Sequence, residues 1–336
     1  MIHEAEEKYY FDGELGAVYT PESTEFRMWS PFAEEVSLNI YPDGSDSPAS
    51  DIVPMTKDEN GVWSVKCQGD LDNVYYTYSV TFEGVAEETI DIYAKAAGVN
   101  GNRGEVVNFA KTNPIGWGNF KAKPLKNYTD AVIYETHVRD FSVDRSGGFT
   151  HKGKFLAFTE TGMYNQYGDK VGIDHLIELG ITHVHLLPVF DYYTVDESKT
   201  EKPQFNWGYD PKNFNFPEGS YSTDPYEGKT RIVEFKRMVH ALHKAGIAVV
   251  MDVVYNHTYQ TLDSAFTKSF PGYYYRNFGE HYSNGSGCGN DLATERKMVR
   301  KFIVDSLVFW TKEYHIDGFR FDMNSGCKFF FIAEFF

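Results

Sequence analysis

Charged and polar side chains gather at the ends of two apolar runs in the second half of the chain. Asp252, Asn256 and His257 close the run "IAVVMDVVYNHT". Arg320 and Asp322 close a second run, "IDGFRFDM". Since residues two apart in a strand point to the same side, Arg320 and Asp322 are expected to face one way. A guanidinium beside a carboxylate favours the ionised form, which a nucleophile needs, so this pair is a candidate catalytic site.

The same residues also have structural explanations. Arg320 could be shared with Asp252 on the neighbouring strand, which would fix its position, but a purely structural salt bridge between strands would show the same spacing. His257 alone is explained equally well by a helix cap or a loop carbonyl. Asn256 offers the kind of oxygen that binds calcium, although one amide is a weak indication. The sequence therefore requires no cofactor and no metal, and it leaves calcium open.

The loop "QFNWGYDPKNFNFPEGSYSTDP" is long and rich in aromatic residues. Trp207 and Tyr209 offer flat faces, and Asp210 offers a hydrogen-bond acceptor. This combination suits a sugar, because the C–H face of a sugar stacks on a ring while its hydroxyls take hydrogen bonds. A small hydrophobic cluster under a long loop is the alternative explanation.

The elements around these residues alternate between strand and helix. The near-continuous apolar run "DAVIYETHVRDF" predicts a first strand that is buried on both faces. Further strands are predicted at 181–190, 247–258 and 316–323, with helices at 167–180, 227–246 and 291–315. This alternation indicates a parallel sheet built from right-handed β/α units. A dinucleotide-binding sheet would carry a glycine fingerprint after its first strand, and none is present. Polar groups at the ends of the strands favour a (β/α)8 barrel instead.

The N-terminal third follows a different pattern. The segments "EFRMWSP", "VSLNIY", "GVWSVKC" and "YYTYSVTF" are short and rich in β-branched or aromatic residues, which is typical of an antiparallel β-sandwich. The predicted fold class is therefore multidomain, with a β-sandwich followed by the first half of a (β/α)8 TIM barrel of about four β/α units. The expected boundaries are a sandwich at 14–110, a linker at 111–127, the partial barrel at 128–322 and an atypical tail at 323–336.

Composition and charge exclude several partners. The chain has 336 residues, with Lys+Arg 32 against Asp+Glu 48, and a net charge of -16. Nucleic acids and anionic membrane surfaces both need a basic face, so neither is expected as a partner. The acidic start "MIHEAEEKYYFDGE" lacks the basic and apolar regions of a secretory signal, so we expect a cytoplasmic protein. Three widely separated cysteines suggest neither a disulfide framework nor a metal site.

Four short motifs follow one another along the second half of the chain: "FNWGYDP", "DVVYNHT", "GCGNDLATERKMVRKFIVDS" and "DGFRFD". Together they resemble the α-amylase superfamily of glycoside hydrolases (family 13). The "NWGYDP" motif favours type I pullulanases, the debranching enzymes of that superfamily, although Phe205 stands where the pattern usually has tyrosine. The resemblance covers roughly residues 14–322. The N-terminal sandwich is similar to the starch-type carbohydrate-binding module of this family.

The resemblance implies roles for individual residues. Asp322 matches the catalytic nucleophile and Arg320 the arginine that orients it. The residues expected to bind substrate are Tyr209 as the platform under the sugar, Asp210 and Trp207 beside it, His257 at the cleavage subsite, and Asp252 with Asn256 in the same motif. The implied reaction is retaining hydrolysis of α-1,6 glucosidic bonds in pullulan, glycogen or starch, with α-1,4 bonds also open. The implied partner is an α-glucan.

The implied general acid has no counterpart in this sequence. In the family it is a glutamate after the fifth barrel strand, and four strands are predicted here. Glu334 lies only 12 positions after Asp322, too near for another β/α repeat, so we assign no general acid. On this count the chain looks like the front part of a larger enzyme, inactive by itself, with open barrel edges through which it could self-associate.

Three other functions remain open at this stage. A non-catalytic α-glucan-binding protein would use the sandwich and the Tyr209 loop. A gene fragment would have no function. A metal-dependent hydrolase is suggested by His183 and His185, which share one face of a strand, although further ligands are missing from the sequence.

Overall fold

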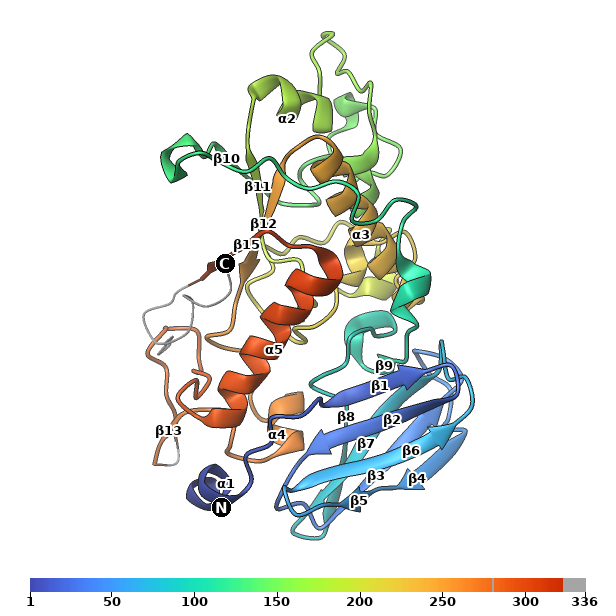
Figure 1. Cartoon of the computed structure of the whole chain (residues 1–336), viewed down its shortest axis with the longest axis vertical. Helices are drawn as coiled ribbons and strands as arrows, with labels where there is room; N and C mark the ends of the chain where they lie inside the picture. The colour runs from blue at the N-terminus through green and yellow to red at the C-terminus, as the bar shows by residue number, and fades with distance from the viewer. Residues whose placement is uncertain (280, 323–336) are drawn as a thin grey trace.

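The computed structural model describes residues 1–279 and 281–322 and shows an N-terminal sandwich joined to a parallel β/α part (Figure 1). The sandwich consists of two antiparallel sheets, with strand orders β1-β2-β6-β5 and β4-β3-β7-β8, and β9 pairs with β7. Its strands are β1 Gly16–Thr20, β2 Ser23–Trp29, β3 Glu35–Tyr41, β4 Asp51–Pro54, β5 Thr56–Lys57, β6 Val62–Gln68, β7 Tyr75–Phe82, β8 Val85–Thr89 and β9 Gly104–Glu105. The predicted sandwich is therefore confirmed.

The β/α part contains a four-stranded parallel sheet in the order β10-β11-β12-β15. Its strands are β10 Ile133–Thr136, β11 His183–Leu186, β12 Ala248–Val253 and β15 Gly318–Phe321. Its helices are α2 Ile173–Leu179, α3 Gly228–Lys244 and α5 Lys297–Tyr314. The predicted alternation of strands and helices is confirmed, and the sheet is open rather than closed, as expected of a partial barrel.

Shorter elements complete the described chain. The helices α1 Ile2–Lys8 and α4 Ala265–Ser269 and the hairpin strands β13 Asn277–Phe278 and β14 His281–Tyr282 lie outside the main sheets. The 3-10 turns are η1 Val99–Gly101, η2 Phe109–Thr112, η3 Tyr128–Asp130, η4 Arg145–Gly147, η5 Phe155–Thr159, η6 Glu197–Lys199 and η7 Gly219–Tyr221. No helix among the described residues is both long and apolar enough to cross a membrane.

Helix α3 packs through an apolar stripe whose members recur at helical spacing. In α3 the stripe Ile232, Phe235, Val239 and Leu242 is fully buried. Helix α2 ends where Gly180 adopts the left-handed conformation, with φ 69, which glycine adopts without steric strain. Helix α3 thus packs against the sheet at β12.

The expectation that the first barrel strand is buried on both faces is wrong. In β10, Ile133 is 60% exposed. The strand pairs only with β11 among the described residues and is therefore the outer strand of the sheet. An apolar run shows that a strand could be buried on both faces, but it is buried only where other parts of the chain cover those faces.

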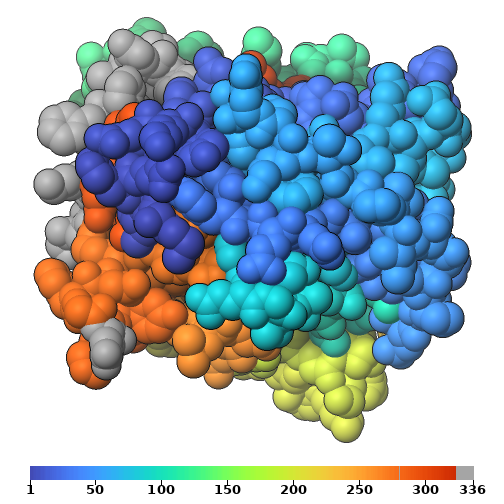
Figure 2. All heavy atoms as spheres, turned by 90° about the horizontal axis from the view of Figure 1, so that it is seen from below, coloured from blue at the N-terminus to red at the C-terminus, as the bar shows by residue number. Residues whose placement is uncertain are grey.

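The sandwich and the β/α part share one hydrophobic core. The Trp29 ring lies 5.5 Å from Phe270 and 4.8 Å from Tyr273, and the Ser30 hydroxyl donates to the Ser269 carbonyl at 2.7 Å. Figure 2 shows the blue atoms of the sandwich directly against the orange atoms of the β/α part. In the segment expected as a linker, Trp117 stacks on His315 at 4.3 Å. The two parts therefore meet across an apolar interface.

Candidate active site

The candidate nucleophile lies where two neighbouring strands end. Strands β12 and β15 pair in a register that places Asp252 opposite Arg320. Nη1 of Arg320 donates to both oxygens of Asp252, at 3.1 and 2.9 Å, and to Oδ1 of Asp322 at 2.6 Å. Asp252 is fully buried, whereas Arg320 and Asp322 are partly exposed. One guanidinium thus fixes a buried carboxylate on one side and presents an accessible carboxylate on the other.

Tyr209 joins the same network from the aromatic loop. Its hydroxyl donates to Oδ2 of Asp252 at 2.8 Å. Burial, and then this bond to Asp252, raise the pKa of Tyr209, so its phenol stays protonated and the ring keeps its position. Nε2 of His185 lies 3.5 Å from the same carboxylate oxygen. The sequence suggested His185 only as a metal ligand together with His183, and its position on the strand next to β12 was the signal that could have placed it beside Asp252.

His257 is held by the loop that carries Tyr209. Its Nε2 lies 3.0 Å from the Tyr209 carbonyl oxygen, and since a carbonyl only accepts, Nε2 carries the proton. Its Nδ1 lies 3.2 Å from the side-chain oxygen of Asn256, which is itself buried. Burial lowers the pKa of His257, so the neutral imidazole is favoured. His257 and Asn256 therefore belong to the frame around Tyr209.

The two remaining predicted residues, Asp210 and Trp207, make no contact with the carboxylates and Arg320 described above. Asp210 accepts from the Asn206 side chain at 2.6 Å and from the Thr194 backbone at 2.9 Å, so its carboxylate closes the loop on itself. Trp207 is 62% exposed, and its ring contacts Phe205 edge-on at 6.4 Å. Trp207 is thus a free aromatic face, while Asp210 has a positioning contact.

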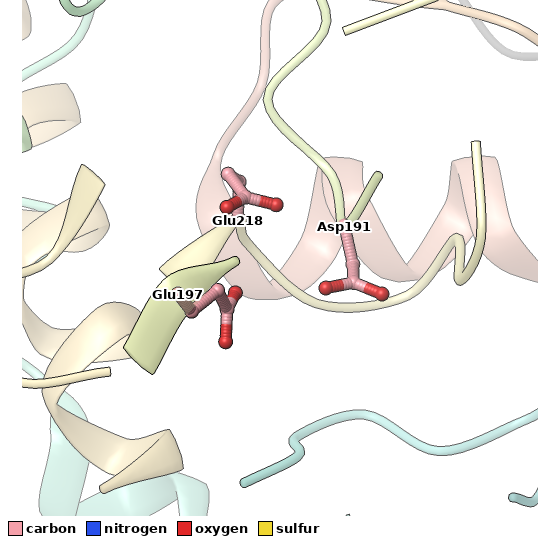
Figure 3. A group of neighbouring side chains, drawn as sticks. All are labelled: Asp191, Glu197 and Glu218. Atoms are coloured by element: carbon pink, nitrogen blue, oxygen red, sulfur yellow. The ribbon is translucent and has the colours of Figure 1, made fainter. Parts of the chain in front are cut away.

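A buried group of three carboxylates includes one residue of this loop, Glu218. Asp191, Glu197 and Glu218 place oxygen atoms within 4.8 Å of one another (Figure 3), and within the described ranges this is the one group of three potential metal ligands. Arg231 is buried beside them and donates to both oxygens of Glu197, at 3.1 and 2.9 Å. The guanidinium supplies the positive charge that a metal ion would otherwise supply. The histidine pair proposed as a metal site belongs to no such group among these residues.

The acidic group gives a testable pH dependence. Burial, and then the charge of Glu197, raise the pKa of Asp191 to about 7, whereas an unfolded aspartate titrates near ~3.9. Between these two pKa values the folded state therefore binds one more proton than the unfolded state. The stabilisation that this proton supplies is complete below about pH 4 and is lost as the pH rises through about 7. Asp191→Asn cannot ionise. The free energy of unfolding of Asp191→Asn should fall less from pH 5 to 8 than that of the native chain. The two slopes should differ by up to about 1.4 kcal/mol per pH unit below pH 7.

Urea denaturation at four pH values measures this difference. Asp224→Asn is the matched control and should keep the native pH slope, because Asp224 is exposed and its bond from the Tyr226 N–H can be kept by an asparagine oxygen. Equal slopes for the native chain and Asp191→Asn would show that Asp191 is already ionised at pH 5.

Comparisons with known proteins match both parts of the chain. The family described as carbohydrate-binding module 48 (isoamylase N-terminal domain) matches residues 14–94, and the family described as alpha amylase, catalytic domain, matches residues 108–278. The second match covers the β/α part from before β10 to beyond β12, including Tyr209, Asp252 and His257.

Several relatives of this chain are named pullulanases. The pullulanase of Bacillus subtilis (strain 168) is 44% identical over 322 residues, which are 95% of this chain and 43% of that protein. Pullulanase 1, chloroplastic, of Arabidopsis thaliana is 35% identical and is matched over 37% of its length. The structure of the Paenibacillus barengoltzii pullulanase in complex with maltohexaose and alpha-cyclodextrin superposes with a TM-score of 0.93 at 47% identity, over 95% of this chain and 50% of that one.

The chain thus spans half or less of the length of these relatives. The match nevertheless runs through both the sandwich and the parallel sheet, in the order in which the relatives carry them. The chain belongs to the α-amylase family, with a module of the isoamylase N-terminal type in front of its catalytic domain, and it corresponds to the N-terminal part of pullulanases.

Proposed function

We propose that this chain provides the nucleophile side of a retaining glycoside hydrolase that cleaves α-1,6 glucosidic bonds in pullulan, glycogen or starch. Cleavage of α-1,4 bonds is the second possibility. The observation that carries the proposal is the cluster of Asp322, Arg320 and Asp252 at the ends of two adjacent strands. The relatives named pullulanases support the same reaction. Because the chain spans half or less of their length, the reaction is proposed for the whole protein.

In this mechanism Asp322 attacks the anomeric carbon and forms a glycosyl ester. Arg320 donates to the Asp322 carboxylate and fixes its orientation at the strand end. Tyr209 lies beside the attacking group and offers its ring to the sugar, while the buried imidazole of His257 holds the Tyr209 backbone in place. A second carboxyl group, about 5–5.5 Å from the nucleophile, must protonate the leaving oxygen and later activate water. No residue of this sequence is assigned that role, and Glu334 lies outside the described residues.

Hydrolysis is tested with a fused enzyme. The chain, joined after Asp322 to the part of the Bacillus subtilis pullulanase that follows the matched region, should release reducing ends from pullulan. The 336-residue chain alone should release none, because a nucleophile without an acid lacks the ~10²- to 10⁴-fold contribution of general acid catalysis and the rest of the cleft. Turnover of pullulan by the chain alone would contradict this assignment.

The second candidate function is α-glucan binding without hydrolysis. The exposed ring of Trp207 and the presence of a carbohydrate-binding module favour it. Calorimetry should show weak binding of maltoheptaose, with a dissociation constant near ~1 mM, because stacking without a closed cleft gives little affinity. Equal affinity for cellohexaose, whose linkage is β, would exclude a specific α-glucan site.

We also propose that the chain self-associates through the open sheet. The outer strand β10 exposes Ile133, and Val132 just before it is also exposed. An unpaired strand edge is a template for another strand. Sedimentation velocity should show oligomers whose share rises with protein concentration. A monomer at all concentrations would contradict the proposal.

A further inference from the structure

The loop 283–292, between β14 and α5, carries the motif "GCGND", which the proposed function does not use. This loop folds around one buried carboxylate. Asp291 accepts from the backbone N–H groups of Gly285 and Ser286, at 2.7 and 3.1 Å, and from the Ser286 hydroxyl at 2.9 Å. Hydrogen bonds to a carboxylate are stronger than those between neutral groups. The neighbouring residue, Asn290, is therefore held in a fixed position.

Asn290 joins this loop to the segment that carries His257. Its side chain is buried, and its oxygen accepts from the Thr258 N–H at 3.1 Å. Its amide nitrogen donates to the Thr258 carbonyl at 2.7 Å. One side chain thus pairs with both backbone groups of a single residue, as a neighbouring strand would. Asparagine can do this because it has a donor and an acceptor on one short side chain.

The segment 256–258 has few other supports. It lies beyond Val253, the last residue of β12, so the pairing of that strand with its neighbours does not extend to it. A second backbone contact comes from the same loop, because the Leu292 N–H donates to the Asn256 carbonyl at 2.9 Å. The loop 283–292 therefore holds the backbone on both sides of His257.

His257 in turn holds the aromatic residue of the candidate active site. Its Nε2–H donates to the Tyr209 carbonyl at 3.0 Å, and the Tyr209 hydroxyl donates to Asp252 at 2.8 Å. A series of contacts therefore runs from Asn290, through the backbone of Thr258 and the imidazole of His257, to the segment that carries the Tyr209 ring. Displacing such a group by ~1 Å can lower the rate of a reaction by ~10²-fold.

We propose that Asn290 is a positioning residue for the candidate active site. By pairing with the backbone of Thr258 it holds His257, and through His257 it holds the Tyr209 ring. The effect on catalysis rests on the proposed function, because it assumes that the ring lies under the reacting sugar. The hold on His257 does not depend on that function, because it follows from contacts within this chain.

The first test is hydrogen exchange of the His257 Nε2–H, measured by nuclear magnetic resonance on the full chain labelled at histidine. The signal that is missing in His257→Gln identifies the residue. This proton is buried and bonded to the Tyr209 carbonyl, so it should exchange slowly in the native chain. Asn290→Ala should speed the exchange by about tenfold or more, because the segment then opens locally. Asn290→Asp keeps the acceptor for Thr258 but loses the donor, and it should speed the exchange even where Asn290→Ala fails to fold.

Asn39→Ala is the matched control. Asn39 is also buried, and it donates to the hydroxyls of Thr77 and Ser79 in the sandwich, at 3.0 and 2.9 Å. Its loss removes two side-chain hydrogen bonds, as Asn290→Ala does, but should leave the exchange of the His257 proton unchanged. Equal acceleration by both variants would mean that the proton reports only a loss of stability. That result, or fast exchange already in the native chain, would overturn the proposal.

The second test measures pullulan hydrolysis by the fused enzyme. Asn290→Ala should lower kcat about tenfold or more and change KM less than about threefold, because a misplaced ring costs more in the transition state than in binding. If the fused parent is inactive, the proposed function fails, and the exchange measurement alone decides whether Asn290 holds His257. If the parent is active and Asn290→Ala keeps its kcat, the positioning role is overturned and the proposed function stands.

Discussion

Asp322→Asn in the fused enzyme should lower reducing-end release from pullulan by about 10⁴-fold or more, because removing one member of a catalytic unit removes nearly all of its effect. The amide is of the same size and keeps an oxygen that can accept from Arg320, as Asp322 does at 2.6 Å. It lacks the negative charge that forms the glycosyl ester. The loss should therefore fall on kcat, while the affinity for glucan stays within about twofold.

The split between kcat and binding distinguishes a nucleophile from a structural carboxylate. If Asp322 only held Arg320 in place, Asp322→Asn would preserve that contact and activity would persist. Asp224→Asn is the matched control, since it makes the same chemical change at an exposed position and should leave kcat unchanged. Activity of Asp322→Asn within tenfold of the fused parent would show that another group forms the covalent intermediate.

The sequence could predict this cluster because its geometry follows from strand register. Residues two apart on a strand share a side, and parallel pairing places Asp252 opposite Arg320. The site therefore needs only two correctly assigned neighbouring strands. The orientation of loop residues is different: Asp210 turned out to close its own loop, and Trp207 lies exposed, because loop conformation depends on contacts with distant segments.

The pattern of apolar residues in the sequence also did not predict that the sandwich and the β/α part share one hydrophobic core. The strand containing Trp29 reads as a normal sandwich strand, yet its ring packs on Phe270 and Tyr273, more than 200 residues away. Alternation shows which face of a strand is apolar but not which surface covers it. The exposure of β10 has the same origin, because neighbours decide burial.

The buried acidic group was missed although one signal for it was present. Arg231 lies four residues before Phe235 and thus on the inward stripe of α3, where a charged residue is rare unless it is paired. Its partners come from the loop between β11 and α3, where Glu197 and Glu218 could equally have been solvent-exposed. An arginine on an apolar helical stripe therefore predicts a buried acidic partner but not its position.

Arg231→Met should lower the free energy of unfolding by about 3–5 kcal/mol, the usual effect of removing one partner from a buried ion pair. The methionine fills much of the same space, so little of the loss comes from a cavity. The loss comes from Glu197, which keeps bonds from the backbone N–H groups of Gly219 and Asn100 but has no cation left beside it. Three backbone carbonyls, of Gly98, Pro217 and Pro225, lose this donor as well. Urea denaturation at pH 7 measures the difference.

A double-mutant cycle separates the charge from the packing. Glu197→Gln added to Arg231→Met should recover at least ~1 kcal/mol, because the uncompensated charge is then gone. Arg27→Met is the matched control: Arg27 pairs with Glu25 at 2.7 Å in a partly exposed position, and its loss should cost less than about 1 kcal/mol. If Arg231→Met costs no more than Arg27→Met, the carboxylates are neutral when buried and need no guanidinium. If the cost is large and the cycle shows no coupling, the carbonyl contacts rather than Glu197 account for the role of Arg231. Coupling of the expected size would show that Arg231 balances the charge of Glu197.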